Sequence, residues 1–192
     1  METLIEKVKA CVLCKDFLPN APKPIFQVGA KAGILIIGQA PGRKAHESGI
    51  PWNDASGNRL RNWLGVGRET FYNPDIFALM PMGFCYPGTG SGGDLPPRPE
   101  CAPTWHYSLR AFMPNIKLTL LIGHYAQKYY LRENSKPTLS ETVGSFKEYE
   151  SGVFPTPHPS PRNLRWLKNN PWFEQDIVPI IGIRVRQIIG GE

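Results

Sequence analysis

Short, wholly apolar runs recur along this chain and alternate with segments whose apolar residues are spaced three or four apart. The clearest run, GILIIG at residues 33–38, is bounded by glycines and has no polar position between them. This pattern is typical of a strand that is buried on both faces of a parallel sheet. We therefore expect strands at residues 33–38, 75–80, 117–122 and 148–155.

Helical spacing predicts helices between and around these strands. Residues 56–65 place Leu60, Trp63 and Leu64 on one face, with Ser56 in position to cap the start and Gly65 to end the helix. The same reasoning gives further helices. The predicted helices span residues 3–10, 56–65, 102–112, 123–131 and 171–189.

Strands that alternate with helices in this way indicate an α/β fold. We predict one domain, residues 1–192, with a three-layer αβα architecture and a central, mainly parallel four-stranded sheet. Ligands of such folds bind beyond the carboxyl ends of the strands. The segments GQAPG at 38–42 and HPSPRN at 158–163 each follow a predicted strand, so we expect both at that edge.

Prolines and glycines are frequent, at 20 and 19 of 192 residues, as in a globular protein with many ordered loops. They are dense at residues 85–103, and a loop of that length must be held in place by something. Cys85 and Cys101 flank this segment, while Cys11 and Cys14 lie near the N-terminus. Four cysteines so unevenly spaced do not form the disulfide framework of a small secreted protein, and they suggest a metal site.

The balance of charge favours a polyanionic partner. Lys and Arg number 22 against 16 for Asp and Glu, which gives a net charge of +6. The longest strictly aliphatic run, residues 34–37, is far shorter than the ~20 residues that a membrane span requires. The first ten residues lack the pattern of a signal peptide. We expect a cytoplasmic protein with no membrane partner and no obligate protein partner.

The order of the motifs resembles the uracil-DNA glycosylase superfamily, and most closely its family 4. That family has GEAPG, then a Gly-x-Pro-Phe stretch, then an HPSP segment; this chain has GQAPG at 38–42, GIPWNDASG at 49–57 and HPSP at 158–161. The family also has C-x2-C near its N-terminus and a later cysteine pair. The resemblance implies a DNA repair enzyme that flips uracil out of DNA and hydrolyses its N-glycosidic bond, leaving an abasic site.

The resemblance also implies roles for individual residues. Trp52 matches the Phe on which the family stacks the base, and His158 matches the His that donates a hydrogen bond to uracil O2. The backbone N–H groups of Gln39 and Ala40, in the turn that begins at Gly38, would point at the same oxygen. Donors in such positions stabilise the charge that develops on the leaving group.

An acid or base near the pocket must also direct water to the sugar. His46, Glu47 and Asp54 are the local candidates. We choose Asp54, because it lies next to Trp52 in the same predicted pocket segment.

The chain departs from the family 4 pattern at three places. Gln39 stands where the family has Glu, and Pro81 stands where the family has the Asn that reads uracil. Asn53 and Asp54 replace the Val-Gly that follows the stacking Phe. We infer that Asn53 reads the base, since one carboxamide can both accept from N3–H and donate to O4.

The family resemblance implies that Cys11, Cys14, Cys85 and Cys101 hold a 4Fe-4S cluster. The number of ligands fits zinc equally well, and a chain without metal remains an alternative. We expect DNA contacts after the second motif, where Arg162 or Leu164 would enter the base stack with Arg165 and Lys168 near phosphates. Arg43 and Lys44, which follow the first motif, are further candidates for phosphate contacts.

Three other functions fit parts of this pattern. A catalytically weak protein of the same fold would bind DNA or abasic sites, as the replaced Glu and Asn suggest. A small-molecule hydrolase or nucleoside-processing enzyme would use the same pocket without the basic rim. A metal-dependent structural protein would account for the four cysteines but not for the two pocket motifs.

Overall fold

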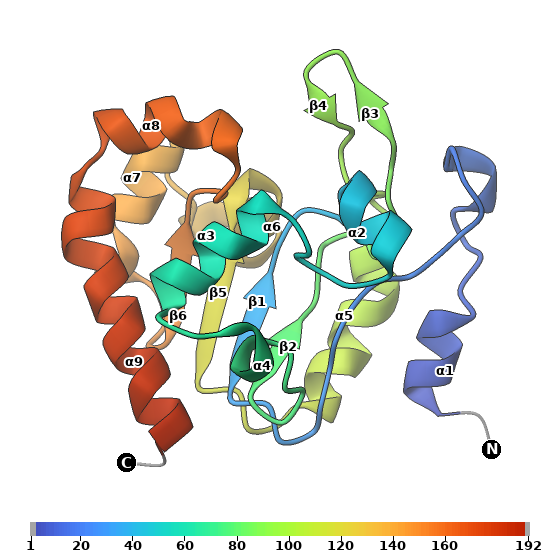
Figure 1. The fold of residues 1–192 in the computed structure, drawn as a ribbon, viewed down its shortest axis with the longest axis horizontal. Coiled ribbons are helices and arrows are strands. Elements are labelled where there is room, and N and C mark those ends of the chain that lie inside the picture. The colour runs from blue at the N-terminus through green and yellow to red at the C-terminus, as the bar shows by residue number, and fades with distance from the viewer. Residues whose placement is uncertain (1–2, 191–192) are drawn as a thin grey trace.

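The computed structural model describes residues 3–190 and is built around one parallel four-stranded sheet (Figure 1). The strand order is β2-β1-β5-β6, and each neighbouring pair is parallel. The strands are β1 (Ile34–Ile37), β2 (Phe77–Leu79), β5 (Leu118–Ile122) and β6 (Val153–Thr156). The predicted αβα fold with a four-stranded sheet is confirmed.

The apolar run of β1 is explained by burial on both faces. All four of its side chains are buried, and they alternate between two cores. Ile34 and Ile36 pack in one core with residues of the helices on that side, whereas Leu35 and Ile37 pack in the other. A central strand of a covered sheet has no solvent face, so no polar residue interrupts the run.

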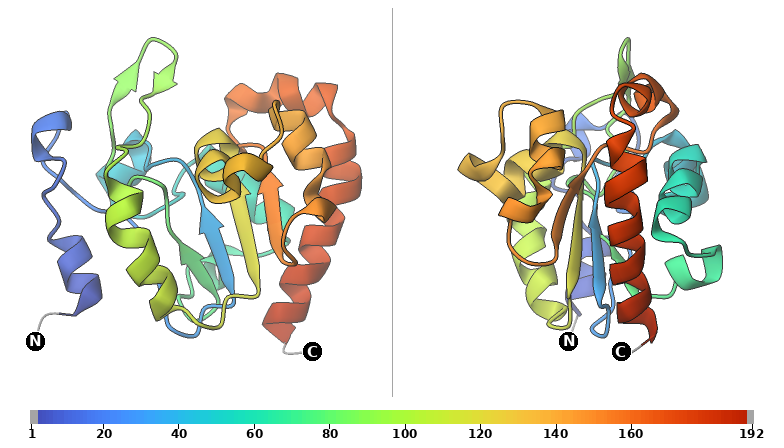
Figure 2. Two further views of the ribbon diagram at one scale, coloured as in Figure 1. Left: turned by 180° about the vertical axis from the view of Figure 1, so that it is seen from behind. Right: turned by 90° about the vertical axis from the view of Figure 1, so that its left-hand side faces the viewer.

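Helices cover both faces of the sheet, as Figure 2 shows in its right-hand view. One face carries α3 (Ala55–Leu64) and α9 (Val178–Gly190), and the other carries α1 (Leu4–Lys9), α5 (Cys101–Phe112) and α6 (Gly123–Leu131). The remaining α-helices are α2 (Arg43–Ser48), α4 (Arg68–Phe71), α7 (Leu139–Gly144) and α8 (Leu164–Asn169). Short 3-10 turns lie at Lys15–Phe17, Arg132–Asn134, Phe146–Glu148 and Pro161–Asn163, and a π-helical turn at Phe173–Ile177 leads into α9.

The cap of α3 differs from the prediction. Asp54, and not Ser56, caps the helix, since its side chain accepts a hydrogen bond from the backbone N–H of Gly57 at 2.8 Å. Ser56 is buried in the first turn of the helix. Asp and Ser are both favoured cap residues, so the two positions are not distinguished by residue preference alone.

Several local predictions were wrong in their details. Residues 85–103 contain a small antiparallel hairpin, β3 (Thr89–Gly90) and β4 (Gly93–Asp94), and α5 already begins at Cys101. The strand expected at 148–155 begins only at Val153, because a 3-10 turn at Phe146–Glu148 is followed by bends and turns over residues 149–152. In the polar stretch after the first motif, α2 was not predicted. Within residues 3–190, no helix is long and apolar enough to cross a membrane.

Candidate active site

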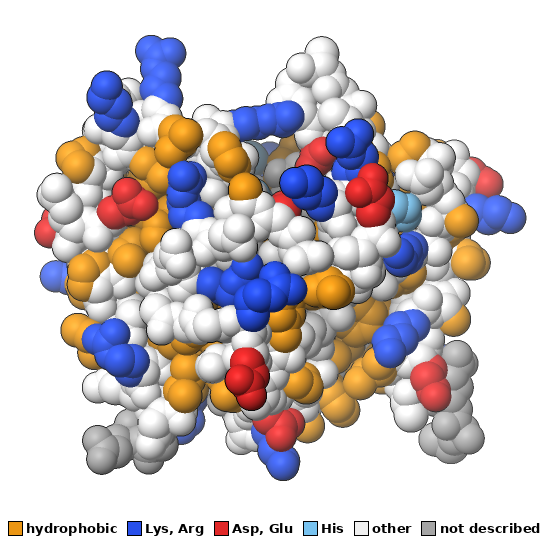
Figure 3. Space-filling model, viewed as in Figure 1, with side chains coloured by type: hydrophobic (Ala, Val, Ile, Leu, Met, Phe, Trp, Pro, Cys, Tyr) orange, Lys and Arg blue, Asp and Glu red, His pale blue; other side chains and the backbone are white. Residues whose placement is uncertain are grey.

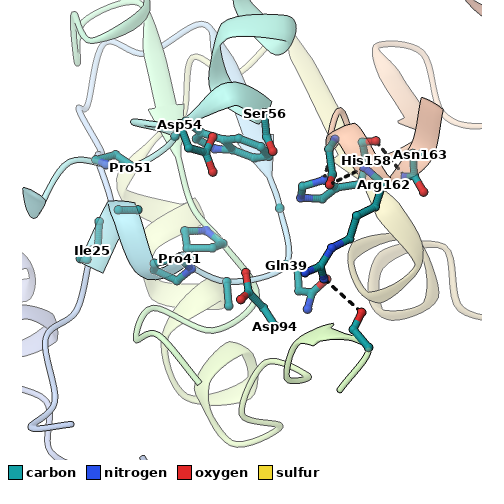
Figure 4. Close-up of a pocket in the computed structure, with 18 residues that line it drawn as sticks. Ile25, Gln39, Pro41, Pro51, Asp54, Ser56, Asp94, His158, Arg162 and Asn163 are labelled. Carbon is teal, nitrogen blue, oxygen red and sulfur yellow. Dashed lines mark hydrogen bonds between the residues drawn. The ribbon is translucent and has the colours of Figure 1, made fainter. Parts of the chain in front are cut away.

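A pocket of about 440 Å³ lies at the carboxyl ends of the strands, next to the β3–β4 hairpin (Figure 4). Its walls come from the loops after β1, β2 and β6, from the start of α3 and from the hairpin. Ligands of α/β folds are expected at this edge. The lining residues with candidate roles are Gly38, Gln39, Ala40, Trp52, Asp54, Asp94, His158 and Arg162.

The loop after β1 is held by the loop after β2. The Met82 N–H donates to the Gly38 carbonyl at 2.8 Å, and the Gly83 N–H donates to the Gln39 carbonyl at 3.0 Å. The N–H groups of Gln39 and Ala40 donate to no protein acceptor within residues 3–190. These two donors line the pocket wall, so a ligand oxygen can accept from them.

The side chain of Gln39 has a separate task. Its Nε2 donates to the backbone carbonyl of Leu95 at 3.1 Å. Leu95 directly follows β4, so the first motif is tied to the base of the hairpin. The side-chain carboxamide of Gln39 is therefore bound to the protein backbone, whereas its backbone N–H faces no protein acceptor in the described part of the chain.

Trp52 is held tightly by its neighbours. Its backbone has φ 57°, in the left-handed region that residues other than glycine rarely adopt. A Cβ on Gly38 would lie 2.7 Å from Trp52 Cζ2, and a Cβ on Gly57 would lie 1.8 Å from the Trp52 carbonyl oxygen. Both glycines are needed because the indole packs against the end of β1 and the backbone of residue 52 packs against α3.

A buried arginine supports this strained segment. Arg61 Nη1 lies 3.5 Å from the Trp52 carbonyl oxygen, and the Tyr72 hydroxyl donates to the Pro51 carbonyl at 2.9 Å. The guanidinium of Arg61 also lies over the ring of Phe71, 5.3 Å from its centroid. Residues that persist in such backbone conformations are fixed by their surroundings, and here Arg61 and Tyr72 contribute to that fixation.

The imidazole of His158 has a defined hydrogen-bonding pattern. The Ser160 N–H donates to Nδ1 at 3.2 Å, so the neutral ring carries its proton on Nε2. Burial lowers the pKa of His158, while the nearby carboxylates of Asp54 and Asp94 act in the opposite direction. A neutral imidazole with an Nε2–H donor is sufficient for the role that the resemblance implies.

Asp94 is a pocket residue that the sequence reasoning missed. It lies in β4, within the Gly- and Pro-rich segment for which no regular structure was expected, and no motif includes it. With Asp54 it makes two carboxylates in the pocket lining. Its side chain accepts a hydrogen bond from nearby Thr89, but the bonds that tie the hairpin to the pocket come from Gln39 and Arg162, which are distant in the sequence.

Asn53 is not brought to the pocket lining. Its side-chain oxygen accepts a hydrogen bond from Arg68 Nη1 at 3.2 Å on an exposed surface. Pro81 does line the pocket, and its carbonyl accepts from Nε2 of the buried His106 at 3.1 Å. Since Nε2 donates, Nδ1 of the same ring accepts from the Tyr130 hydroxyl at 2.7 Å.

The candidate DNA-contacting residues lie around the pocket mouth. Arg43 and Lys44 are exposed at the start of α2, and Leu164 and Arg165 are exposed at the start of α8. Arg162 reaches across to the hairpin, where its Nη1 donates to the Gly92 carbonyl at 3.0 Å. In Figure 3, Lys and Arg side chains flank the hollow near the top of the molecule, together with a few acidic ones.

All four cysteines line one small cavity, against Phe84 and Arg98. Cys11 and Cys14 come from the segment after α1, Cys85 from the loop after β2, and Cys101 from the start of α5. Burial raises the pKa of Cys85 to about 11 and that of Cys101 to about 12. The backbone N–H of Phe84 donates to Cys101 Sγ at 3.3 Å.

The four thiols are one ligand set that more than one metal group could use. In the part of the chain that the structure describes, no three Cys, His, Asp or Glu side chains converge closely enough to hold one metal ion. A tetrahedral zinc ion needs all four sulfurs about 2.3 Å from a single point. Four cysteine thiolates are also the ligand set of a 4Fe-4S cluster, so the residues themselves fit either group.

Comparisons with known proteins agree with the predicted resemblance. The family model of the uracil DNA glycosylase superfamily matches residues 26–181. The chain is 28% identical to a type-4 uracil-DNA glycosylase of Sulfurisphaera tokodaii over 174 residues, which cover 83% of this chain and 74% of that protein. Type-4 uracil-DNA glycosylases of Saccharolobus solfataricus and Thermotoga maritima are 27% and 24% identical, with 83% of this chain covered in each case and 76% and 81% of the relatives. The family match includes every residue that lines the pocket except Ile25, and it begins after Cys11 and Cys14.

Proposed function

The chain belongs to the uracil DNA glycosylase superfamily, and on this premise we propose that it is a DNA repair hydrolase that releases uracil from DNA. We propose further that residues 1–192 act as a single glycosylase domain. The observation that carries the proposal is the convergence of Trp52, His158 and the free N–H groups of Gln39 and Ala40 on one pocket. These groups supply an aromatic surface and several donors for one base.

The base would enter this pocket only after it is flipped out of the helix. Trp52 offers the face on which the base stacks. The N–H groups of Gln39 and Ala40 and the Nε2–H of His158 donate to uracil O2. As the C1′–N1 bond breaks, its electron pair moves onto the base, and these donors stabilise the negative charge on O2.

Water must then attack C1′ of the sugar from within the pocket. Asp54 lines the pocket, and one of its oxygens is fixed by the Gly57 N–H at 2.8 Å. The other oxygen is available to accept a hydrogen bond from the attacking water and so to orient it. Gln39 contributes its backbone N–H, and its side chain keeps the first motif attached to the hairpin.

Base discrimination is assigned to Asn53, as the sequence suggested. In the free protein its amide oxygen accepts from Arg68. Reading the base therefore requires the amide to exchange Arg68 for the N3–H and O4 of uracil when DNA binds. This requirement makes the assignment testable.

DNA containing uracil is the proposed partner. Arg43, Lys44 and Arg165 are proposed to contact phosphates, while Arg162 or Leu164 enters the base stack. Because phosphate contacts make affinity fall steeply with salt, binding should weaken as ionic strength rises. Binding that ignores salt would favour a small-molecule substrate instead.

A 4Fe-4S cluster held by the four cysteines is the proposed cofactor. Support comes from the family resemblance, from the shared cavity and from the Phe84 N–H donated to Cys101 Sγ, since hydrogen bonds to sulfur tune such clusters. When bound, the cluster would supply a covalent link between the segment of Cys11 and Cys14 and the core. Four cysteine ligands fit zinc equally well, so the family resemblance is what selects iron.

The test is release of free base from oligonucleotides that contain uracil, hypoxanthine, xanthine or a mismatched thymine. We expect release from the uracil substrate, detected as alkali-labile abasic sites. DNA binding without any release would favour the alternative of a catalytically weak DNA-binding or abasic-site-binding protein, which the replacement of the family's Glu by Gln39 supports.

A further inference from the structure

The β3–β4 hairpin is tied to the pocket from two sides. Arg162 Nη1 donates to the Gly92 carbonyl at 3.0 Å, and Gln39 Nε2 donates to the Leu95 carbonyl at 3.1 Å. The two bonds flank Asp94 in the sequence, and Asp94 lines the same pocket as Gln39 (Figure 4). The hairpin therefore delivers one carboxylate to the pocket in a fixed place.

Gly42 lies beside both pocket carboxylates. A Cβ on Gly42 would be 3.2 Å from Asp94 Oδ2 and 4.0 Å from Asp54 Oδ2. The other oxygen of each is engaged, because Asp54 Oδ1 accepts the Gly57 N–H at 2.8 Å and Asp94 Oδ1 accepts the Thr89 hydroxyl at 3.2 Å. Each residue thus presents Oδ2 to the same small space next to Gly42.

We propose that Asp94 is a catalytic residue that, together with Asp54, holds the attacking water beside Gly42. The inference rests on the glycosylase function proposed above. In this step the C1′–N1 bond breaks and its electron pair leaves with uracil N1. The water oxygen bonds to C1′, and the water proton passes to Asp94 Oδ2. The two negative charges also stabilise the positive charge that develops on the sugar.

Asp94 supplies a carboxylate that the first motif lacks, because Gln39 replaces the family's Glu. Gln39 stands where family 4 has Glu, and a carboxamide whose nitrogen donates to Leu95 is a poor proton acceptor. The hairpin that Gln39 holds brings a carboxylate to the same part of the pocket. We therefore infer that Asp94 takes the role of the family's Glu, while Gln39 holds the hairpin that carries Asp94.

Two pairs of matched variants test the inference. Asp94→Asn removes the charge and keeps the shape, and its control is Asp75→Asn, a surface residue paired with Lys31 at 3.5 Å. Gly42→Ala places a methyl group beside the two carboxylates. Its control is Gly67→Ala, since Gly67 has nearly the same backbone (φ −79°, ψ 175° against φ −77°, ψ 174°), also precedes a short helix and has open space around its Cβ.

The measurement is single-turnover release of uracil, with DNA affinity and melting temperature followed in parallel. We expect Asp94→Asn and Gly42→Ala each to slow release by about 100-fold or more, as the loss of a general base does. Affinity for uracil-containing DNA and melting temperature should stay close to wild type. Both control variants should keep the wild-type rate.

Wild-type rates in Asp94→Asn and Gly42→Ala would overturn the inference and leave the glycosylase function intact. A full rate in Gly42→Ala alone would also overturn it, since the shared water position would be wrong. A wild-type protein that binds DNA and releases no base would overturn both proposals. If Asp94→Asn does not fold, Gly42→Ala decides the matter alone.

Discussion

The indole of Trp52 and the imidazole of His158 lie next to each other, with ring centroids 5.6 Å apart and planes inclined by 30°. One residue follows the first motif and the other follows β6, so this contact joins the two ends of the pocket. The proposed base-stacking surface therefore directly adjoins the proposed donor to uracil O2. A change at either residue should disturb the other.

His158→Ala should slow uracil release by about 10²–10³-fold, or roughly 2.7–4 kcal/mol, because one donor to the developing charge is lost. DNA binding should remain nearly intact. Single-turnover kinetics and a binding titration measure the two effects separately. The control is His124→Ala at an exposed position in α6. A wild-type rate in His158→Ala would show that the assigned role is wrong.

Gly38→Ala should impair release because its Cβ would lie 2.7 Å from Trp52 Cζ2 and displace the indole. Overpacking of this kind typically costs about 1–3 kcal/mol. Gly38→Ala combined with Trp52→Phe should recover much of the rate, since the smaller ring leaves room for the methyl group and the family itself uses Phe there. Both proteins are compared by kcat/KM. No recovery in the double variant would mean that the methyl group acts on something other than the indole.

Asn53→Asp should weaken discrimination between uracil and cytosine, because a carboxylate cannot donate to O4. Each unpaired polar group at such a site costs roughly 1–3 kcal/mol. Arg68→Gln is the control, since it removes the partner of Asn53 in the free protein and leaves the carboxamide available. The measurement is relative release from paired substrates. Unchanged selectivity in Asn53→Asp would remove Asn53 from base reading.

The purified protein should be brown, with absorbance near ~400 nm as expected for iron bound by thiolates. Cys85→Ser and Cys101→Ser should each lose this absorbance and melt at a lower temperature, because the metal no longer joins the N-terminal segment to the core. Iron and zinc are counted by elemental analysis. Stoichiometric zinc in a colourless sample would select zinc as the metal. A sample that contains neither iron nor zinc would contradict the proposed metal site.

Stability should decline as the pH falls from 6.5 towards 4. Burial lowers the pKa of His106 to about 4 from its ordinary 6.5, so between these values the unfolded chain binds the extra proton and is favoured. The loss from this residue amounts to at most about 3 kcal/mol. Urea unfolding of wild type and His106→Gln across this range measures it. A pH dependence that is equally steep in both proteins would contradict this prediction.

Much of the fold was determined by the sequence alone. Apolar runs and helical spacing predicted the four strands, the helices on either side and the edge that carries the pocket. This was possible because burial on both faces of the sheet makes consecutive positions of a strand such as β1 apolar. The two cysteine pairs were visible as spacings, and the structure brings all four to one cavity. Element ends were less well determined, since Asp54 and Ser56 are both good caps.

Only the tertiary structure decided which side chains face the pocket. The hairpin that carries Asp94 is tied to the pocket by bonds from Gln39 to the Leu95 carbonyl and from Arg162 to the Gly92 carbonyl, which are 56 and 70 positions away in the sequence. Asn53, adjacent to Trp52 in the sequence, binds Arg68 on the surface instead. Strand patterns reflect burial, which acts on consecutive residues, whereas the direction of a loop side chain depends on partners that the local sequence does not contain.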